Sequence, residues 1–237
     1  IVVSRVESNV VYAASQHLWR TANEGQSWER ISPDLTRALP ETLGDSGGPI
    51  TKDQNGPEFY ATIFSVAPSR HDPKTIWVGS DDGLVSITRD GGRTWARITP
   101  PDMKEFTRVS LIDASPHEAG AAYLAAKRYQ LDDRAPYIFK TKDYGKTWSP
   151  LSGNLPSEPV NVIKEDPQKP QILYVGTDLG AYVTLDGGKP WHSLCNQLPT
   201  AAVYDLVVHP RDHELVIGTH GRSIFVLDVK SIQSRVP

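Results

Sequence analysis

The chain has 237 residues, a formal net charge of −3 and a hydrophobic content of 38%. This length is enough to bury a substantial core, and a weakly acidic chain without a run of Lys and Arg argues against nucleic acid or an anionic membrane as the main partner. No apolar run reaches the length of a membrane span, and the single cysteine, Cys195, excludes an internal disulfide.

In chain order, the sequence predicts five units of short strands. Four of the units begin with an apolar strand that ends near a proline, as at 64–68, and continue with a second strand, as at 76–79. A third and a fourth strand follow, which makes four antiparallel strands per unit, the composition of a propeller blade. The predicted blades cover residues 1–36, 59–101, 106–150, 158–195 and 201–229.

One short pattern recurs between the third and fourth strands: Thr, an acidic or amide residue two positions on, Gly two further, and then Trp. We expect the acidic or amide side chain to bond to nearby backbone N–H groups, the Gly to take a positive φ, and the Trp to seal the turn against the sheet. The four copies contain Asn23 with Trp28, Asp90 with Trp95, Asp143 with Trp148, and Asp186 with Trp191.

Unequal spacing of the repeats predicts two insertions, at 37–58 between the first two blades and at 128–136 inside the third. Long loops on a repeated scaffold usually carry function, because the blades themselves are committed to packing. Function is therefore expected in the loops.

The fifth blade differs from the others in ending without the recurring turn. Its third strand at 223–227 is followed by Asp228 and a short polar tail, with no fourth strand. Since an unpaired edge promotes aggregation, we expect missing blades or a strand, from upstream sequence or from another chain, to complete this sheet. Residues 1–6 already read as the inner strand of the first blade, so the chain is interpreted as the C-terminal part of a larger propeller.

The recurring pattern resembles the Asp-box, or BNR repeat, of sialidases, sortilin and xyloglucanase-type glycoside hydrolases, where it fastens β-propeller blades and carries no catalysis. Segments 79–83, 127–133, 137–148 and 218–223 resemble a bacterial group labelled sortilin-like or "glycosyl hydrolase". That group is similar in blade pattern to the photosystem II assembly factor propeller. The resemblance implies an all-β propeller in a secreted or periplasmic protein.

Blade geometry predicts which loops lie together. The turns between second and third strands and the links between blades lie at one end, the top, around the mouth of the central channel. A non-catalytic interaction or assembly propeller that binds a protein segment or a glycan there is the favoured function, because Arg and Tyr commonly anchor interfaces. The candidate binding residues are Arg108, Arg128, Tyr129, Asp178, His220 and Arg222. Ordinary turn chemistry also explains Asp178.

A glycoside hydrolase is the alternative. It needs two carboxylates that face each other across a cleft, one as acid and one as base or nucleophile. Asp82 with Asp132 or Asp133 is the best pair available, although Asp82 before Gly83 is also an ordinary turn residue. A sialidase-like site would instead use Tyr129 with three arginines, Arg108, Arg128 and Arg222.

A trypsin-like protease is a remote alternative. Residues 44–50 read Gly-Asp-Ser-Gly-Gly-Pro-Ile, like the active-serine segment of those enzymes. Their chemistry also needs a His base and a buried Asp that precede the serine, and His17 is the single His before Ser46. We therefore predict a Gly-rich loop with an inert Ser46.

No metal or cofactor is predicted. The seven His and one Cys lack the close spacings of zinc ligands. The expected partners are a protein or glycan ligand at the top and the segment that completes the ring, without nucleic acid and without a membrane span.

Overall fold

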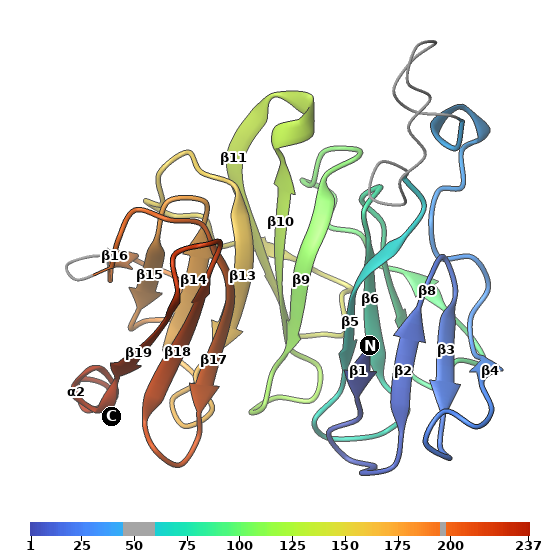
Figure 1. Ribbon diagram of the computed structural model, residues 1–237, viewed down its shortest axis with the longest axis horizontal. Coiled ribbons are helices and arrows are strands. Elements are labelled where there is room, and N and C mark those ends of the chain that lie inside the picture. The colour runs from blue at the N-terminus through green and yellow to red at the C-terminus, as the bar shows by residue number, and fades with distance from the viewer. Residues whose placement is uncertain (45–59, 195–197) are drawn as a thin grey trace. The chain divides into compact units, whose positions relative to one another are not determined.

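The structure is a computed structural model that describes residues 1–44, 60–194 and 198–237. These residues form five antiparallel sheets, with three short helical segments between or after them (Figure 1). The chain divides into a first unit, Ile1–Val109, and a second unit, Ser110–Pro237. The prediction of an all-β chain built from successive blade-like sheets is confirmed.

The first unit contains two four-stranded sheets in which the strands follow chain order. One sheet consists of β1 (Val2–Val3), β2 (Val11–Ala14), β3 (Leu18–Thr21) and β4 (Glu29–Arg30). The other consists of β5 (Ile63–Pro68), β6 (Ile76–Ser80), β7 (Val85–Thr88) and β8 (Ala96–Arg97). A 3₁₀ turn, η1 (Pro40–Thr42), lies in the segment after the first sheet.

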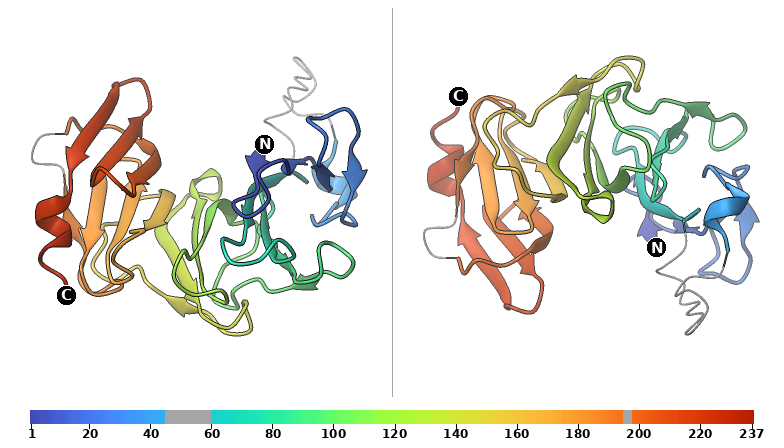
Figure 2. Two further views of the ribbon diagram at one scale, coloured as in Figure 1. Left: turned by 90° about the horizontal axis from the view of Figure 1, so that it is seen from below. Right: turned by 90° about the horizontal axis from the view of Figure 1, so that it is seen from above.

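The second unit contains the remaining sheets, of which the last has three strands. The first is β9 (Arg108–Ala114), whose first two residues belong to the first unit, with β10 (Ala122–Arg128), β11 (Asp133–Thr141) and β12 (Ser149–Pro150). The next is β13 (Val160–Glu165), β14 (Leu173–Thr177), β15 (Ala181–Thr184) and β16 (His192–Ser193). The last sheet consists of β17 (Val203–His209), β18 (Glu214–Thr219) and β19 (Ile224–Asp228). This sheet, coloured dark orange to red in Figure 2, lies beside the sheet of β13–β16.

The hydrophobic cores lie between neighbouring sheets. In the second unit, Tyr174 of β14 and Leu206 of β17 are both fully buried in the core that joins the last two sheets. Tyr12 and Ile76 belong to the core that joins the two sheets of the first unit. Because a central sheet is covered on both faces, its strands read as nearly continuous apolar runs, and every residue of β14 is buried.

The recurring Thr–Asx–Gly–Trp segments form the turns between third and fourth strands, which we call box turns. In the second, Asp90 Oδ2 accepts a hydrogen bond from Thr94 Oγ1 (2.6 Å), and Asp90 Oδ1 accepts one from the Thr94 amide (2.9 Å). These bonds lower the pKa of Asp90 to about 2. A backbone amide bonds to the equivalent side chain in the other box turns, at Asn23, Asp143 and Asp186.

Trp28 lies beside the glycine of its own box turn, since a Cβ added to Gly25 would lie 3.7 Å from Trp28 Nε1. Two other box tryptophans make a further contact that the sequence did not predict. Trp95 Nε1 donates to the carbonyl oxygen of Ile31 (3.0 Å), and Trp191 Nε1 donates to that of Leu151 (2.8 Å). Each acceptor is the first residue after the fourth strand of the preceding sheet. An indole N–H that leaves water needs an acceptor, and the preceding sheet supplies it. Trp95 and Trp191 therefore each join two blades.

The glycine of the box turn allows this close approach. Gly92 has φ +97°, and an added Cβ would lie 2.4 Å from the carbonyl oxygen of Ile31. The position therefore requires glycine both for its backbone conformation and for the space beside the preceding sheet.

The C-terminal residues are not the polar tail that the sequence suggested. They form a short helix, α2 (Lys230–Gln233), flanked by the buried side chains of Val229 and Val236. Gln233 Nε2 donates to Asp166 Oδ2 (2.8 Å) in the neighbouring sheet. In the sequence, mostly polar residues separate Val229 from Val236, so the apolar face of this short helix does not stand out.

The predicted insertions are only partly loops. In the third sheet, β10 and β11 extend into residues 128–136, where Arg128 pairs with Asp133 across a 3₁₀ turn, η3 (Tyr129–Leu131). Of residues 37–58, the structure describes 37–44. Ser46 and Cys195 lie outside the described residues.

The contact between blades predicts that two tryptophans contribute unequally to the stability of the protein. Trp191 is 4% exposed and bonded to Leu151, whereas Trp28 of the first sheet is 41% exposed. We expect Trp191→Ala to lower the free energy of unfolding by roughly 3–5 kcal/mol, through a cavity and a lost hydrogen bond. Trp28→Ala should lower it by less than about 1 kcal/mol. Equal losses in urea denaturation would contradict this account of the joint.

Candidate functional site

Strand pairing defines the top end of each sheet. The inner strands β13 and β17 begin where β14 and β18 end, because Val160 pairs with Thr177 and Val203 pairs with Thr219. The turns after β14 and β18 therefore lie at the same end as the starts of the inner strands. The box turns lie at the opposite end of the sheets.

The register also aligns the top turns of different sheets. Each box threonine pairs with the first residue of a second strand, as Thr88 does with Ile76 and Thr184 with Leu173. Five residues after this position, the second to fifth sheets carry an ionisable side chain, whereas the first sheet carries Gln16. These residues are Asp81, Lys127, Asp178 and His220. Asp178 and His220 are among the candidates that the sequence predicts, whereas Lys127 is not, because the lengthened hairpin hides its alignment.

Lys127 is the centre of a polar network in the second unit. Its side chain is only 3% exposed, and Nζ donates to Asn161 Oδ1 (2.6 Å). Asn161 Nδ2 in turn donates to Asp178 Oδ1 (3.0 Å). A buried ammonium group is costly unless it is bonded, so this network holds the ends of β10, β13 and β14 together.

Two aromatic rings also lie near the ammonium group of Lys127. Lys127 Nζ lies 5.0 Å from the ring centroid of Tyr204 on β17 and 5.6 Å from that of Tyr129. A cation in this position is attracted by the ring quadrupole. The Tyr204 ring also lies against His220, with centroids 5.3 Å apart and planes tilted by 40°. The cation thus links tyrosines from the first and third sheets of the unit.

Large apolar side chains are exposed around this network. Their exposed fractions are 44% for Tyr129, 44% for Leu131, 49% for Leu179 and 50% for Tyr204. Three of them lie in turns after second strands, and Tyr204 lies at the start of β17. We call these four residues the top surface of the second unit.

The remaining candidates of the second unit have individual surroundings. Arg128 Nη1 lies 3.7 Å from Asp133 Oδ2, which also accepts a hydrogen bond from the Tyr137 hydroxyl (2.8 Å). Asp132 is exposed and takes a left-handed conformation at the end of η3. Arg222 is exposed in the turn between β18 and β19. The candidate carboxylate Asp133 is therefore already engaged in holding its hairpin.

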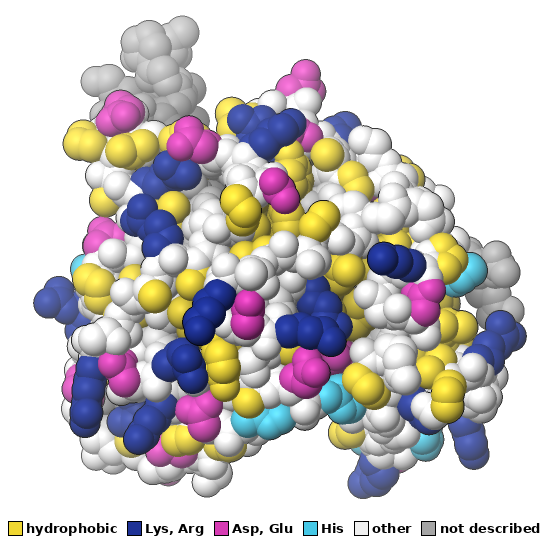
Figure 3. Space-filling model, turned by 180° about the vertical axis from the view of Figure 1, so that it is seen from behind, with side chains coloured by type: hydrophobic (Ala, Val, Ile, Leu, Met, Phe, Trp, Pro, Cys, Tyr) yellow, Lys and Arg dark blue, Asp and Glu magenta, His cyan; other side chains and the backbone are white. Residues whose placement is uncertain are grey.

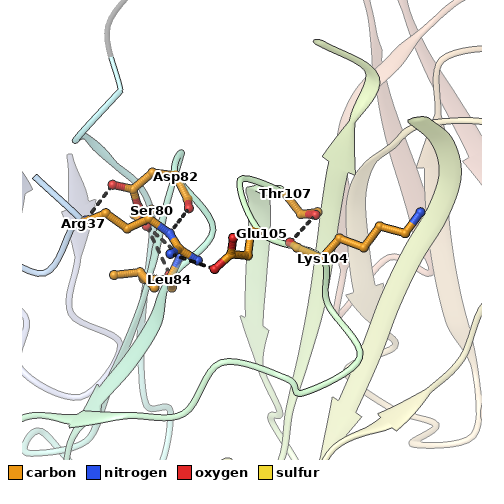
Figure 4. A network of polar contacts seen from close by, with 7 residues as sticks. All are labelled: Arg37, Ser80, Asp82, Leu84, Lys104, Glu105 and Thr107. Atoms are coloured by element: carbon orange, nitrogen blue, oxygen red, sulfur yellow. Dashed lines mark hydrogen bonds and ion pairs between the residues drawn. The ribbon is translucent and has the colours of Figure 1, made fainter. Parts of the chain in front are cut away.

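Asp82 in the first unit is also engaged (Figure 4). It is 1% exposed, and its Oδ2 accepts a hydrogen bond from the backbone amide of Arg37 (2.7 Å), while its Oδ1 accepts one from the Ser80 hydroxyl. Arg37 Nε donates to the carbonyl oxygen of Asp82 (2.9 Å), and Arg37 Nη1 lies 3.4 Å from Glu105 Oε1. Asp82 thus anchors the segment that leaves the first sheet.

Two further features of the first unit surround this anchor. The guanidinium of Arg37 lies 5.0 Å from the ring centroid of Phe106, and that of Arg108 lies 4.6 Å from the ring of Phe64. The buried Nε of Arg108 has no hydrogen-bond partner within the described part of the chain. The candidate Arg108 is therefore half-buried against an aromatic ring.

The described residues contain no group of three or more His, Cys, Asp and Glu side chains that could hold a metal ion. None of the helices in the described ranges is long and apolar enough to cross a membrane. Basic and acidic side chains are interspersed on the face in Figure 3.

Comparison with solved structures supports the fold. The GH74 xyloglucanase from Xanthomonas campestris is 20% identical, with a TM-score of 0.69 over 95% of this chain and 36% of its own. The β-propeller domain of Cps50 (Swd1) from Myceliophteria thermophila is 10% identical, with a TM-score of 0.66 over 98% of this chain and 65% of its own. The chain is therefore a β-propeller protein.

A family model and a curated relative narrow the class. The model described as "Photosynthesis system II assembly factor YCF48" matches residues 58–226, and the chain belongs to this family. A probable oligoxyloglucan-reducing end-specific xyloglucanase of Neosartorya fischeri is 26% identical over 230 residues, which are 90% of this chain and 25% of the relative. The chain thus spans a quarter of that relative. The predicted resemblance to the photosystem II assembly factor and to xyloglucanases is confirmed.

Asp81 predicts a pH dependence of stability. Burial raises its pKa to about 6, and the charge of Asp82 acts in the same direction, against a hydrogen bond from the Thr62 amide. The folded state thus holds this proton more tightly than the unfolded state, whose pKa is about 3.9. The resulting stability is fully present below about pH 4 and is lost as the pH rises through about 6.

Asp81→Asn should remove this loss. We expect the variant to exceed the wild type in free energy of unfolding by roughly 1–3 kcal/mol at pH 7.5. At pH 4 the two proteins should differ much less. Urea denaturation at both pH values measures the difference, and an equal difference at the two pH values would contradict the assignment.

Proposed function

We propose that this chain is a non-catalytic interaction propeller that binds a protein segment at the top surface of its second unit. The observation that carries the proposal is the exposure of Tyr129, Leu131, Leu179 and Tyr204 around a buried, bonded lysine. Exposed aromatic and aliphatic side chains near one another are typical of protein-binding sites.

The aliphatic members favour a protein over a glycan. A sugar presents hydroxyl groups that need polar partners, whereas the side chains of Leu131 and Leu179 offer only apolar contact. A protein segment with apolar side chains gains free energy by covering both leucines and both tyrosine rings. The family description as an assembly factor agrees with a protein partner.

The network beneath the surface supports affinity as well. The ammonium of Lys127 lies near both tyrosine rings, and Asn161 holds it in place. Side chains that are already positioned lose less conformational entropy on binding. The rings can therefore act as anchors without first becoming ordered.

The hydrolase interpretation finds less support in the same residues. Asp82 is buried and accepts hydrogen bonds from Arg37 and Ser80, and Asp133 accepts one from Tyr137 and pairs with Arg128. A catalytic carboxylate must instead face the substrate. Asp132 is exposed and is the acidic candidate that a ligand reaches without rearrangement.

The proposal predicts a specific loss of affinity. Peptides are first selected for binding to the wild-type chain from a displayed library, and the affinity of one is measured by calorimetry. Tyr204→Ala should weaken this peptide about 10–100-fold. Trp28→Ala removes an aromatic side chain of similar exposure from a box turn and is the matched control, which should change the affinity less than about twofold.

Two outcomes would overturn the proposal. One is a selected peptide whose affinity is lowered by Trp28→Ala and not by Tyr204→Ala. The other is turnover of oligoxyloglucan or a sialoside that disappears in Asp82→Asn or Asp132→Asn, which would establish the hydrolase interpretation.

A further inference from the structure

Arg108 and Phe64 form a pair of a cation and an aromatic ring in the first unit. Phe64 on β5 is 47% exposed, and the guanidinium of Arg108 lies 4.6 Å from the centroid of its ring. Both residues lie where an inner strand begins, since Phe64 is the second residue of β5 and Arg108 is the first of β9. The pair therefore lies at the top end of its sheets.

A similar pair in the second unit shows what accompanies such a cation. Phe64 and Tyr204 occupy equivalent positions, because each lies in the register shift at the start of an inner strand. The ring of Tyr204 lies 5.0 Å from Lys127 Nζ, and this ammonium group donates a hydrogen bond to Asn161 Oδ1. In the second unit, the chain itself thus supplies an oxygen atom to the cation.

Arg108 has no such oxygen atom. Among the residues that the structure describes, none forms an ion pair or a hydrogen bond with its guanidinium. Two other half-buried arginines each lie near a carboxylate, Arg37 near that of Glu105 (3.4 Å) and Arg128 near that of Asp133 (3.7 Å). A charged group that is partly withdrawn from water gains by finding a partner. The guanidinium of Arg108 is therefore available to an oxygen atom of a ligand.

The orientation of the guanidinium indicates which ligand fits. Arg108 Nε is enclosed by protein, whereas Nη1 and Nη2 are open to solvent. Two N–H groups in one plane match the two oxygens of a carboxylate, which can accept a hydrogen bond from each. The exposed part of the Phe64 ring lies beside this edge and offers an apolar contact.

We propose that Arg108 and Phe64 form a binding site for a carboxylate that is attached to an aromatic or other apolar group. Nη1 and Nη2 of Arg108 bind the two carboxylate oxygens, and the ring of Phe64 packs against the apolar group. This site lies in the first unit and does not depend on the peptide site proposed for the second.

Benzoate is the minimal probe, because it joins a carboxylate directly to an aromatic ring. The enclosed Nε–H of Arg108 is shielded from exchange with water and gives a signal in ¹H–¹⁵N NMR that should shift as benzoate is added. We expect a Kd on the order of 1 mM. Benzamide has the same shape without the charge and should bind at least about tenfold more weakly.

Two protein variants separate the planar fork of Arg108 from its charge. Arg108→Lys keeps the positive charge and removes the fork, and should weaken benzoate binding at least about tenfold. Arg97→Gln removes one positive charge from the exposed strand β8 of the same unit and is the matched control, which should change the affinity less than about twofold. Backbone amide signals of residues 63–65 report the affinity in each variant.

Two peptides distinguish the possible sources of the carboxylate. N-acetyl-Phe-Glu-amide carries the carboxylate in a side chain, whereas N-acetyl-Gln-Phe carries it at the C-terminus. Binding of one peptide at least about tenfold tighter than benzoate would identify the site as one for that kind of protein segment. Weaker binding of both peptides would identify a free aromatic acid as the ligand class.

Three results would overturn the proposal. They are no shift of the Arg108 Nε–H signal at benzoate concentrations on the order of 10 mM, equal binding of benzoate and benzamide, and an Arg108→Lys variant that binds benzoate as well as the wild type. If Arg108→Lys fails to fold, the comparison of benzoate with benzamide on the wild-type chain still decides the question.

Discussion

The joint between successive blades is the interaction on which this structure depends. Two box tryptophans donate the indole N–H to the carbonyl oxygen of the residue that follows the preceding sheet, Trp95 to Ile31 and Trp191 to Leu151. The box glycine makes room for the contact. Together with the apolar cores between sheets, this joint commits the box turns to structure, so changes there act mainly on stability.

The opposite end of the sheets is under a different constraint. Aligned top positions carry Asp81, Lys127, Asp178 and His220, and a charged side chain that is buried there must find partners. Lys127 finds them in Asn161 and two tyrosine rings. This arrangement orders the top surface before any ligand arrives. The proposed function places binding at the end of the strands opposite to the box turns, so that a change in an exposed top side chain leaves the joint between blades intact.

The sequence predicts the parts of the fold that depend on local chemistry. The Thr, Asx and Gly of each box turn interact within a few residues, so their spacing alone indicates a turn. Contacts between distant residues leave no such signal: the bond from Trp191 to Leu151 and the anchor of Arg37 on Asp82 join separate elements. The position of Lys127 is not evident from the sequence, because the longer strands β10 and β11 shift its hairpin relative to the other repeats. The apolar face of α2 was too short to show a period.

Hydrogen–deuterium exchange of the chain with and without a selected peptide is the most direct test of the central claim, that the top surface of the second unit binds a protein segment. The account predicts slower exchange on binding in the backbone amides of 128–133, 178–180 and 203–204. It predicts no change in the box turns at 88–95 and 141–148. Slower exchange confined to the box turns, with none at the top, would contradict it.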